Sequence, residues 1–425
     1  MSSGPRRAPL AGLLLAAAVA LGLAAPAATA QRVFYDTVAV APRLALTHNR
    51  IATGDLNGDG RPDLFLAGLD LLTGQPTTNI LRFTIANRST PARGDTTFSV
   101  AYSSTVNQFG SVWGGDVLVH DLNGDGRADL VFSGANDSTS TARPVSGAAT
   151  QSGGTPRTLN SVSVAEFPLP ALAHARLAAS GRTVAAMGRT ASGALTLTLL
   201  RRSAATGTAH AATALSTGLE LGALAFGDCD RDGDDDLFAT GLDAAGRPRA
   251  LLYRNDGGTF AETAATGVPG IFNGDALMRD LDGDGDADLA LTGSAYGPFG
   301  TEGVTRVLRA ENCAFTPVAL APDIEHLEGT GIATGDLEGD GRDLFVMGRL
   351  PEQPTQTFIV PIGTLAAPLA IRERLSGAGY GNLVVLDYDG DGFDDLLRVG
   401  VREQPINGST QAVRHVVLTR ARFRP

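Results

Sequence analysis

Six short stretches of the chain place oxygen-bearing side chains at alternate positions, a pattern suited to binding a metal ion. In the first, Asp55 to Asp63, Asp or Asn occupies positions 1, 3 and 5, Gly position 6 and Asp position 9. Calcium takes roughly six to eight oxygen ligands in irregular geometry, and Gly allows a turn that points the position 7 carbonyl inward. The spacing therefore predicts calcium-binding loops. The other five begin at Asp121, Asp228, Asp280, Asp336 and Asp387.

The predicted ligands are the side chains at positions 1, 3, 5 and 9 and the backbone carbonyl at position 7. The first three loops supply Asp55, Asn57, Asp59, Arg61, Asp63, Asp121, Asn123, Asp125, Arg127, Asp129, Asp228, Asp230, Asp232, Asp234 and Asp236. The last three supply Asp280, Asp282, Asp284, Asp286, Asp288, Asp336, Glu338, Asp340, Asp343, Asp387, Asp389, Asp391, Phe393 and Asp395. In the loop at Asp336 the third residue is Glu338 and the last acid, Asp343, comes one residue early. Five loops are therefore regular, and the sequence leaves metal binding at the sixth undecided.

Two other interpretations of these loops, an EF-hand and a solvated acidic turn, fit the sequence less well. An EF-hand loop shares the first six positions but needs a bidentate Glu at position 12, between helices. Here position 12 falls in an apolar run typical of a strand. A merely solvated acidic turn is disfavoured by like charges crowded as they are from Asp228 to Asp236, since such charges repel without a cation among them.

The spacing of the loops indicates a repeat of about 50 residues, which is typical of solenoids and propellers. Each loop precedes a short apolar strand ending on Gly, and two further strand-like runs follow. A degenerate unit without an acidic loop occupies residues 173–217, where a Ser180-Gly181 turn replaces it. This predicts an all-β, seven-bladed β-propeller with four-stranded antiparallel blades. Residues 33–41 resemble an outer strand, so we expect them to pair with the last blade and close the ring, and residues 135–160 to form a surface insertion in the second blade.

The remaining features concern the ends, the charge and the cysteines. Residues 1–30 have Arg6 and Arg7 before an apolar run and small residues up to Ala30, the pattern of a secretory signal peptide. We therefore expect a secreted, periplasmic or cell-surface protein, with residues 31–425 as a single propeller and no transmembrane segment.

The formal net charge is −11 and lysine is absent, which excludes a Schiff-base lysine and gives no basic patch for nucleic acid. Cys229 and Cys313 lie in different repeats, and the sequence favours a buried apolar role for Cys229 over a disulfide.

These repeats resemble a known family. The run Asp280 to Leu289, with Leu252 to Phe260 before it, is similar to the FG-GAP or VCBS repeats of bacterial secreted proteins and of the integrin alpha-subunit N-terminal β-propeller. The resemblance covers essentially residues 33–425. It implies seven blades, with calcium held between the first two strands of a blade. We expect the propeller to be monomeric.

The resemblance also implies where a partner binds. In such propellers ligands bind the face opposite the calcium loops, so a calcium-stabilised binding or adhesion module for an extracellular carbohydrate or protein is expected, with no catalysis. The alternative is a calcium-dependent polysaccharide lyase or hydrolase, but no nucleophile motif appears and the six histidines are scattered. Aromatic and histidine side chains expected on the ligand face are Phe109, Trp113, Phe272, Tyr296, Phe299, His326 and Tyr380.

Overall fold

The computed structural model describes residues 36–39, 46–56, 60, 62–70, 76–84, 97–103, 113–135, 144–151, 159–161, 167–202, 210–215, 218–298, 300–337, 342–350, 353–363, 365, 368–387, 392–406 and 409–420. Within these ranges the regular structure is β-strand apart from one short helix, α1 (Pro322–Glu325). The described strands pair with antiparallel neighbours, apart from a single parallel bridge between Gly293 and Glu328. The predicted all-β class with four-stranded antiparallel sheets is therefore confirmed.

The described strands fall into seven groups of four in chain order, here called units 1 to 7. Unit 1 contains β2 (Leu46–Gly54), β3 (Asp63–Asp70), β4 (Pro76–Thr84) and β5 (Thr97–Ser103). Unit 2 contains β6 (Trp113–His120), β7 (Asp129–Ala135), β8 (Pro144–Gln151) and β9 (Leu159–Ser161). Unit 3 contains β10 (Ala173–Ser180), β11 (Thr183–Arg189), β12 (Leu195–Arg202) and β13 (His210–Ala214). Unit 4 contains β14 (Glu220–Gly227), β15 (Asp236–Leu242), β16 (Pro248–Asp256) and β17 (Thr259–Thr263).

The last three units complete the series. Unit 5 contains β18 (Phe272–Arg279), β19 (Asp288–Gly297), β20 (Gly300–Glu311) and β21 (Ala314–Val318). Unit 6 contains β22 (Glu328–Gly335), β23 (Arg342–Arg349), β24 (Gln356–Ile362) and β25 (Glu373–Ser376). Unit 7 contains β26 (Gly379–Leu386), β27 (Asp395–Ile406), β28 (Ser409–Arg420) and the N-terminal strand β1 (Asp36–Ala39). The parallel bridge joins units 5 and 6 into one eight-stranded sheet.

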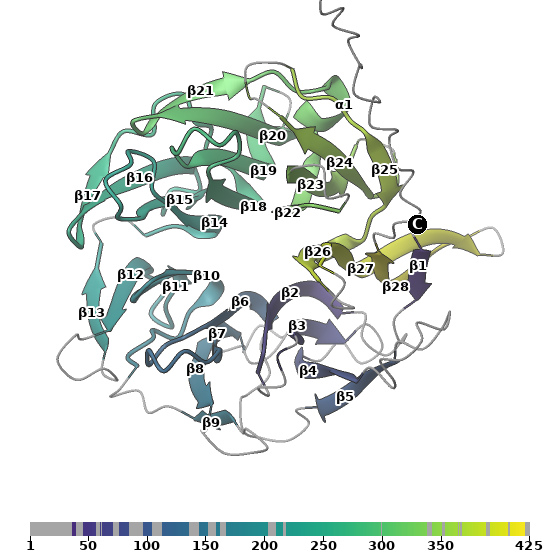
Figure 1. Ribbon diagram of the computed structural model, residues 1–425, viewed down its shortest axis with the longest axis horizontal. Coiled ribbons are helices and arrows are strands. Elements are labelled where there is room, and N and C mark those ends of the chain that lie inside the picture. The colour runs from purple at the N-terminus through teal and green to yellow at the C-terminus, as the bar shows by residue number, and fades with distance from the viewer. Residues whose placement is uncertain are drawn as a thin grey trace, which may run out of the picture.

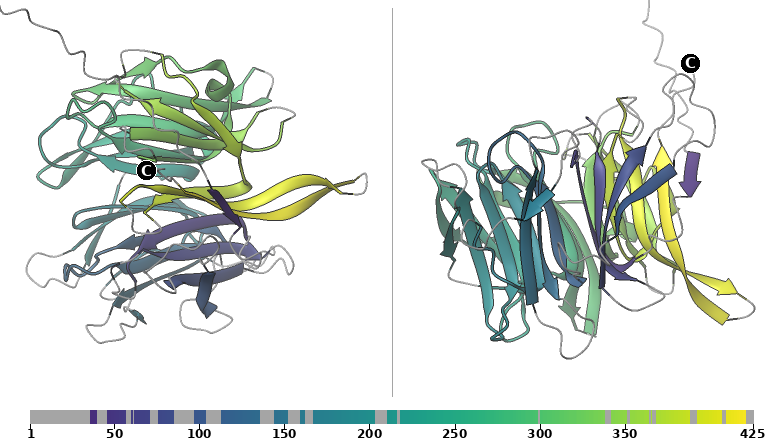
Figure 2. Two further views of the ribbon diagram at one scale, coloured as in Figure 1. Left: turned by 45° about the vertical axis from the view of Figure 1, so that its right-hand side comes forward. Right: turned by 90° about the horizontal axis from the view of Figure 1, so that it is seen from below.

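The units are arranged around a common centre, with the first strand of each unit innermost (Figure 1). Consecutive first strands contact one another from β2 through β6, β10, β14, β18 and β22 to β26, and β26 also contacts β2. The N-terminal strand β1 pairs with β28, Asp36 opposite Arg420 and Ala39 opposite Val417. The expected pairing of the N-terminal segment with the last unit is thus present. Beyond β26, strands β27 and β28 continue as a ribbon that projects from the rest of the molecule (Figure 2).

The hydrophobic core lies between neighbouring sheets. One cluster packs Phe238 and Leu252 of unit 4 against Met278 and Leu289 of unit 5. Five further clusters join units 1 and 2, 2 and 3, 3 and 4, 5 and 6, and 6 and 7 in the same manner among the described residues. Because the sheets of units 2 to 6 are covered on both faces, second strands such as β7 are buried along their whole length. This explains the continuous apolar runs after each acidic loop.

Each first strand is interrupted by a bulge near its start, at matching positions in all seven units of the described chain. The bulge brings a carbonyl of the first strand against the glycine that ends the second strand. A Cβ built on Gly241 would lie 2.6 Å from the carbonyl oxygen of Glu220, and one on Gly348 would lie 2.6 Å from that of Glu328. The closing glycine of the repeat is therefore required by this close approach of two backbones.

Glycines inside the bulge give a direct test of this packing. A Cβ on Gly115 would overlap the carbonyl oxygen of Ser133 in the neighbouring strand. We expect Gly115→Ala to destabilise the protein by about 1 to 3 kcal/mol, the usual cost of overpacking. Gly363→Ala is the matched control, because no heavy atom lies within 4 Å of its added Cβ. Chemical denaturation of both variants measures the difference, and equal stabilities would contradict the assignment of the bulge.

Charged side chains follow several of these bulges and lie near one another at the centre of the molecule. The Arg50 guanidinium lies 3.8 Å from the Asp116 carboxylate. Arg176 donates a hydrogen bond to the carbonyl of Gly222, and its burial lowers its pKa to about 9, with Arg50 as a second, repulsive cause. Asp275 has a raised pKa for the same reason, burial. The repeat pattern alone did not indicate this central cluster.

Two segments differ from the simple repeat. The sequence predicts a surface insertion at residues 135–160, but residues 144–151 and 159–161 form β8 and β9 of unit 2. That prediction is wrong for these residues. The buried residues of β8 are small rather than polar, and the side chain of Phe132 fills the space over Gly147. In unit 3, β10 and β11 are joined by a tight turn at Gly181 and Arg182 in place of an acidic loop.

In the described part of the chain no helix is long and apolar enough to cross a bilayer. The predicted signal peptide, residues 1–30, lies outside the described residues.

Candidate metal-binding loops

The acidic loops connect the first and second strands of their units. Three are described in full, namely 121–129, 228–236 and 280–288, here called loop 121, loop 228 and loop 280. In the other three loops, some predicted ligands lie outside the described residues; these are Asn57, Asp59, Arg61, Glu338, Asp340, Asp389 and Asp391.

The first Asp organises the turn in the five regular loops. Its carboxylate accepts a hydrogen bond from the amide of the Gly at position 6, as in the 2.9 Å contact between Asp228 and Gly233. The same bond is 2.9 Å long at Asp55 and Asp121, 3.0 Å at Asp387 and 3.2 Å at Asp280. The repeated hydrogen bond shows that these loops share the conformation of a six-residue turn, and not only their amino-acid composition.

The ninth Asp ties the loop to the sheet. Asp236 accepts hydrogen bonds from the amide of Cys229, at 3.0 Å, and from that of Asn255 on β16, at 2.8 Å. Asp288 makes the equivalent bonds to Leu281, at 2.9 Å, and to Ala310 on β20, at 2.8 Å. Each of these aspartates therefore joins the first turn, the second strand and the third strand. Asp236 and Asp288 are buried, and so are the last acids of the other four loops, Asp63, Asp129, Asp343 and Asp395.

Three of the five predicted ligand positions converge. In loop 228, carboxylate oxygens of Asp228, Asp230 and Asp236 lie within 4.8 Å of one another. In loop 280, those of Asp280, Asp282 and Asp288 do the same. These are positions 1, 3 and 9, while the fifth aspartates are not part of either group. The structure thus brings together most, but not all, of the side chains that the spacing predicts as ligands.

The electrostatics of these groups fit a cation. Burial raises the pKa of Asp288 to about 6, and it raises the pKa of Asp236 as well, with neighbouring aspartates adding to the shift. The Asp230 side chain is 3% exposed, and its Oδ1 atom is buried without a hydrogen-bond partner. A buried carboxylate oxygen of this kind needs a proton or a cation. A calcium ion held by Asp228, Asp230 and Asp236 would supply that charge.

Arginines to which the sequence pattern gave no role contact the same carboxylates. Arg254, on β16, forms an ion pair with Asp230. Arg309 holds the matching place on β20, with its Nε 3.1 Å from Asp282 and its Nη2 2.7 Å from Asp284. The sequence does show an Arg at the same place in the third strand of both repeats. Its contact with the loop could be recognised only from the strand register, which places that residue beside the loop.

The irregular loop at Asp336 differs in structure as well as in sequence. Its last acid, Asp343, is buried and receives a hydrogen bond of 2.9 Å from Nη2 of Arg372. The amide of Asp336 donates to the Asp394 carboxylate of the next loop, at 2.7 Å. An arginine therefore stands beside the carboxylate that would be the last ligand of this loop.

The two cysteines form a disulfide, with their Cα atoms 4.7 Å apart, so the expectation of an unpaired Cys229 is wrong. Cys229 is the second residue of loop 228, and Cys313 lies in the turn between β20 and β21 of unit 5. The Cys313 amide also donates to the carbonyl of Cys229, at 2.7 Å. Neighbouring units bring together residues that are 84 positions apart, a contact that spacing along the sequence cannot reveal.

The residues predicted for the ligand face lie, where described, at the strand ends opposite the acidic loops. Tyr296 is 57% exposed, and its ring lies 5.0 Å from that of Phe272. Phe272 itself is buried, and its ring packs against that of Tyr296. His326 is exposed and follows α1. Phe109, Phe299 and the side chains of Trp113 and Tyr380 lie outside the described residues.

An ion-pair cluster joins units 3 and 4 at the same end. The carboxylate of Glu220 accepts hydrogen bonds from Arg189, and it lies 3.0 Å from Nδ1 of His174. The hydrogen bond from Arg189 lowers the pKa of Glu220 below its usual value of 4.5, and His174 adds to this effect. A lowered carboxyl pKa stabilises the fold above the unfolded-state pKa, and this stability is lost as pH falls through the folded-state pKa.

We therefore expect Glu220→Gln to cost about 2 kcal/mol near neutral pH, typical for a hydrogen bond to a charged group. The cost should shrink steadily as the pH falls below about 4.5 and through the lowered pKa of Glu220. Melting curves of both proteins in chelator, which keeps calcium release out of the comparison, measure it. A difference that stays constant over this pH range would contradict the ionised role of Glu220.

Comparison with known proteins identifies part of this architecture. Residues 228–291 match the family model of the FG-GAP-like repeat. The matched segment begins at loop 228 and runs through loop 280 into β19, so it contains both convergent aspartate groups. The predicted resemblance to FG-GAP repeats is confirmed for this segment. No curated protein matches the chain.

Proposed function

We propose that the chain is a calcium-stabilised, seven-bladed β-propeller that binds an extracellular carbohydrate or protein. The propeller is supported by the contacts that run through all seven first strands, from β2 to β26 and back to β2. It is also supported by the pairing of β1 with β28, which gives the last unit its fourth strand. The seven units correspond to the blades, and β1 fastens the first unit of the chain to the last.

The observation that carries the proposal is the convergence of the first, third and ninth aspartates in loops 228 and 280. Calcium prefers several carboxylate oxygens in a flexible arrangement. When bound it supplies positive charge among crowded carboxylates and cross-links the loop. The residues themselves do the positioning: the first Asp holds the turn and the ninth Asp anchors it to the third strand. Because the converging carboxylates of these two loops would be taken up by the ion, we assign the metal a structural role.

The binding surface is assigned to the end of the molecule opposite the loops. Tyr296 is the exposed large hydrophobic residue among those described, and Phe272 fixes its ring from behind. An aromatic ring on a rigid support suits stacking on a sugar or packing against an apolar side chain. Calcium then acts on binding indirectly, by holding the blades that carry this surface.

A glycan array and a pull-down from extracellular material, each with calcium and with chelator, test this assignment. We expect a ligand that is retained by the wild-type protein and weakened several-fold by Tyr296→Ala. The control is Glu302→Gln, which alters a charge on the adjacent strand β20 without removing an aromatic ring. If Tyr296→Ala and the control bind the ligand equally, the surface lies elsewhere.

The alternative function, a calcium-dependent polysaccharide lyase or hydrolase, remains a prediction from the sequence. Turnover of a polysaccharide by the purified protein would favour it over a binding module. That reaction would require a carboxylate or histidine base aimed at the bound sugar.

A further inference from the structure

Arg231 departs from the loop pattern. It occupies position 4 of loop 228, where the other five loops have Gly58, Gly124, Gly283, Gly339 and Gly390. Its φ angle is 62°, in the left-handed region, close to the 78° of Gly124 and the 84° of Gly283. A side chain in this conformation costs roughly 1 to 3 kcal/mol and persists where surrounding contacts hold it. The contacts of Arg231 therefore need an explanation.

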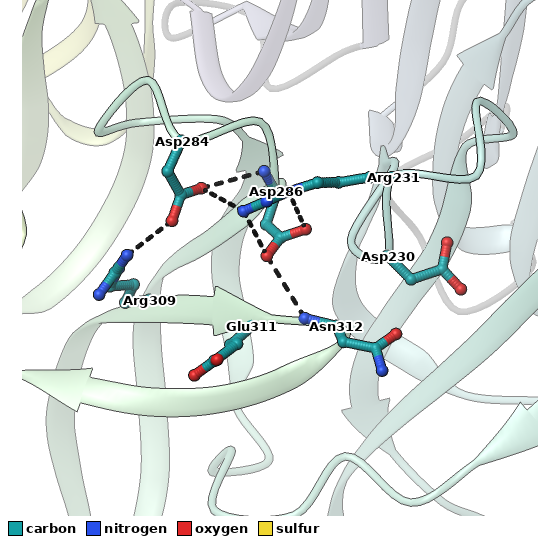
Figure 3. A pocket seen from close by; sticks show the side chains of 7 residues that line it. All are labelled: Asp230, Arg231, Asp284, Asp286, Arg309, Glu311 and Asn312. Atoms are coloured by element: carbon teal, nitrogen blue, oxygen red, sulfur yellow. Dashed lines mark hydrogen bonds and ion pairs between the residues drawn. The ribbon is translucent and has the colours of Figure 1, made fainter.

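The guanidinium of Arg231 reaches across to loop 280 (Figure 3). Its Nε lies 2.8 Å from one oxygen of Asp286, and its Nη2 lies 2.9 Å from the other. The same Nη2 lies 3.3 Å from Asp284. Asp284 and Asp286 are positions 5 and 7 of loop 280, and the Asp286 side chain is only 5% exposed. A bidentate pair to a nearly buried carboxylate is among the stronger ion pairs in proteins.

Loop 280 carries more arginine contacts than the other two fully described loops. Arg309 already pairs with positions 3 and 5, so with Arg231 two guanidinium groups hold positions 3, 5 and 7. In loop 228, Arg254 pairs with Asp230 alone. In loop 121, the partners are Arg127 within the loop and Arg202, 3.9 Å from Asp121. Of the arginines that pair with carboxylates in these three loops, only Arg231 belongs to a neighbouring acidic loop. Arg342, from the loop at Asp336, donates to the backbone carbonyl of Asp280.

Loops 228 and 280 are also joined directly. The amide of Ala287, position 8 of loop 280, donates to the carbonyl of Asp228 at 2.8 Å. The disulfide connects loop 228 to the β20–β21 turn, and the amide of Asn312 in that turn donates to Asp286 at 3.4 Å. A change in the backbone of loop 228 therefore moves the base of Arg231 relative to the carboxylates it binds.

We propose that Arg231 is an intramolecular cation that competes with calcium at loop 280 and makes this loop the weakest of the regular sites. This inference rests on the proposed calcium binding. Arg309 pairs with Asp282, one of the three converging carboxylates, and both Arg231 and Arg309 hold Asp284, the position 5 ligand that the sequence predicts. Like charges at such short range oppose each other. Because Arg231 extends from loop 228, occupancy of loop 228 holds it over loop 280, and the two sites are negatively coupled. By linkage, calcium in loop 280 weakens loop 228 by the same factor.

Two variants at this position separate charge from backbone strain. Arg231→Gly restores the residue of the other loops, and Arg231→Gln keeps the left-handed strain while removing the charge. The control is Arg247→Gln, which removes the charge of an exposed arginine that pairs with Asp243 away from the acidic loops. Calcium titration of the full chain against a chromophoric chelator yields the number of sites and their stepwise Kd values. Melting in chelator provides a second readout.

We expect both Arg231 variants to tighten the weakest site about tenfold, with the number of sites unchanged and the control within about twofold of the wild type. In chelator, Arg231→Gln should melt below the wild type, since Asp286 loses its cation. Calcium binding that is unchanged in both variants would overturn the proposal and leave the proposed function intact. Tightening by Arg231→Gly alone would assign the effect to strain and also overturn it. A wild-type chain that binds no calcium would refute both.

Discussion

In excess chelator the protein is expected to melt about 15 °C lower than in millimolar calcium. A ligand present at 100 times its Kd stabilises the folded state by about 2.7 kcal/mol per site, so five sites would contribute about 13 kcal/mol. For a chain of this length, unfolding entropy converts that energy into a shift of about 15 °C. Differential scanning calorimetry in calcium and in chelator measures the shift.

The physical reason is the charge of the loops. The formal net charge is −11, and more than half of the 45 acidic residues lie in the six loops. Five calcium ions would neutralise nearly all of that charge and relieve the repulsion between converging aspartates such as Asp280, Asp282 and Asp288. Magnesium is the control, because it demands a smaller and more regular octahedron and should restore little stability. An identical melting temperature in calcium and in chelator would contradict the account.

Removing the disulfide is expected to have the second largest effect. Cys229 and Cys313 close a loop with a sequence separation of 84, for which the chain-entropy model gives about 4.6 kcal/mol. We expect Cys229→Ser with Cys313→Ser to lose about this amount, and to lower the melting temperature by about 5 °C. Thermal unfolding of the double variant, compared with the oxidised and the reduced wild type, measures the loss.

The conformation of Cys313 supplies the matched control. Its φ is 63°, and the corresponding residue in the β16–β17 turn is Gly258, with a φ of 89°. Cys229→Ala with Cys313→Gly therefore removes the same bond while relieving backbone strain at the turn. This variant should be more stable than the serine pair and still less stable than the oxidised wild type. If both double variants match the oxidised wild type, the bond contributes no stability.

The repeat was the part of the fold that the sequence could predict. Acids at fixed spacing, a closing glycine and period-two strands are local signals, and they recur in six copies from Asp55 to Asp395. Each copy therefore reinforces the others, and the strand pairing of every unit follows. The closing glycine could be recognised as part of the pattern, but its cause, the nearby bulge of the first strand, required the structure.

Contacts between units were beyond the reach of the sequence. The Cys229–Cys313 bond and the pairing of Arg231 with Asp286 both depend on the packing of unit 4 against unit 5. The burial of Phe272 could not be predicted either, because a position in the sequence does not reveal which side chain covers it. Strand β8 was missed because its core residues, Gly147 to Ala149, are small, and large side chains of neighbouring strands, such as Phe132 over Gly147, complete its packing.

The most direct test of the central claim is the metal content of the purified protein. The full chain is equilibrated with calcium, passed over a desalting column and analysed by mass spectrometry of the elements, with a chelator-treated sample alongside. We predict about five tightly or moderately bound calcium ions per chain, matching the regular loops, and few or none after chelation. A chain that retains no calcium above the buffer background would contradict the assignment of these loops.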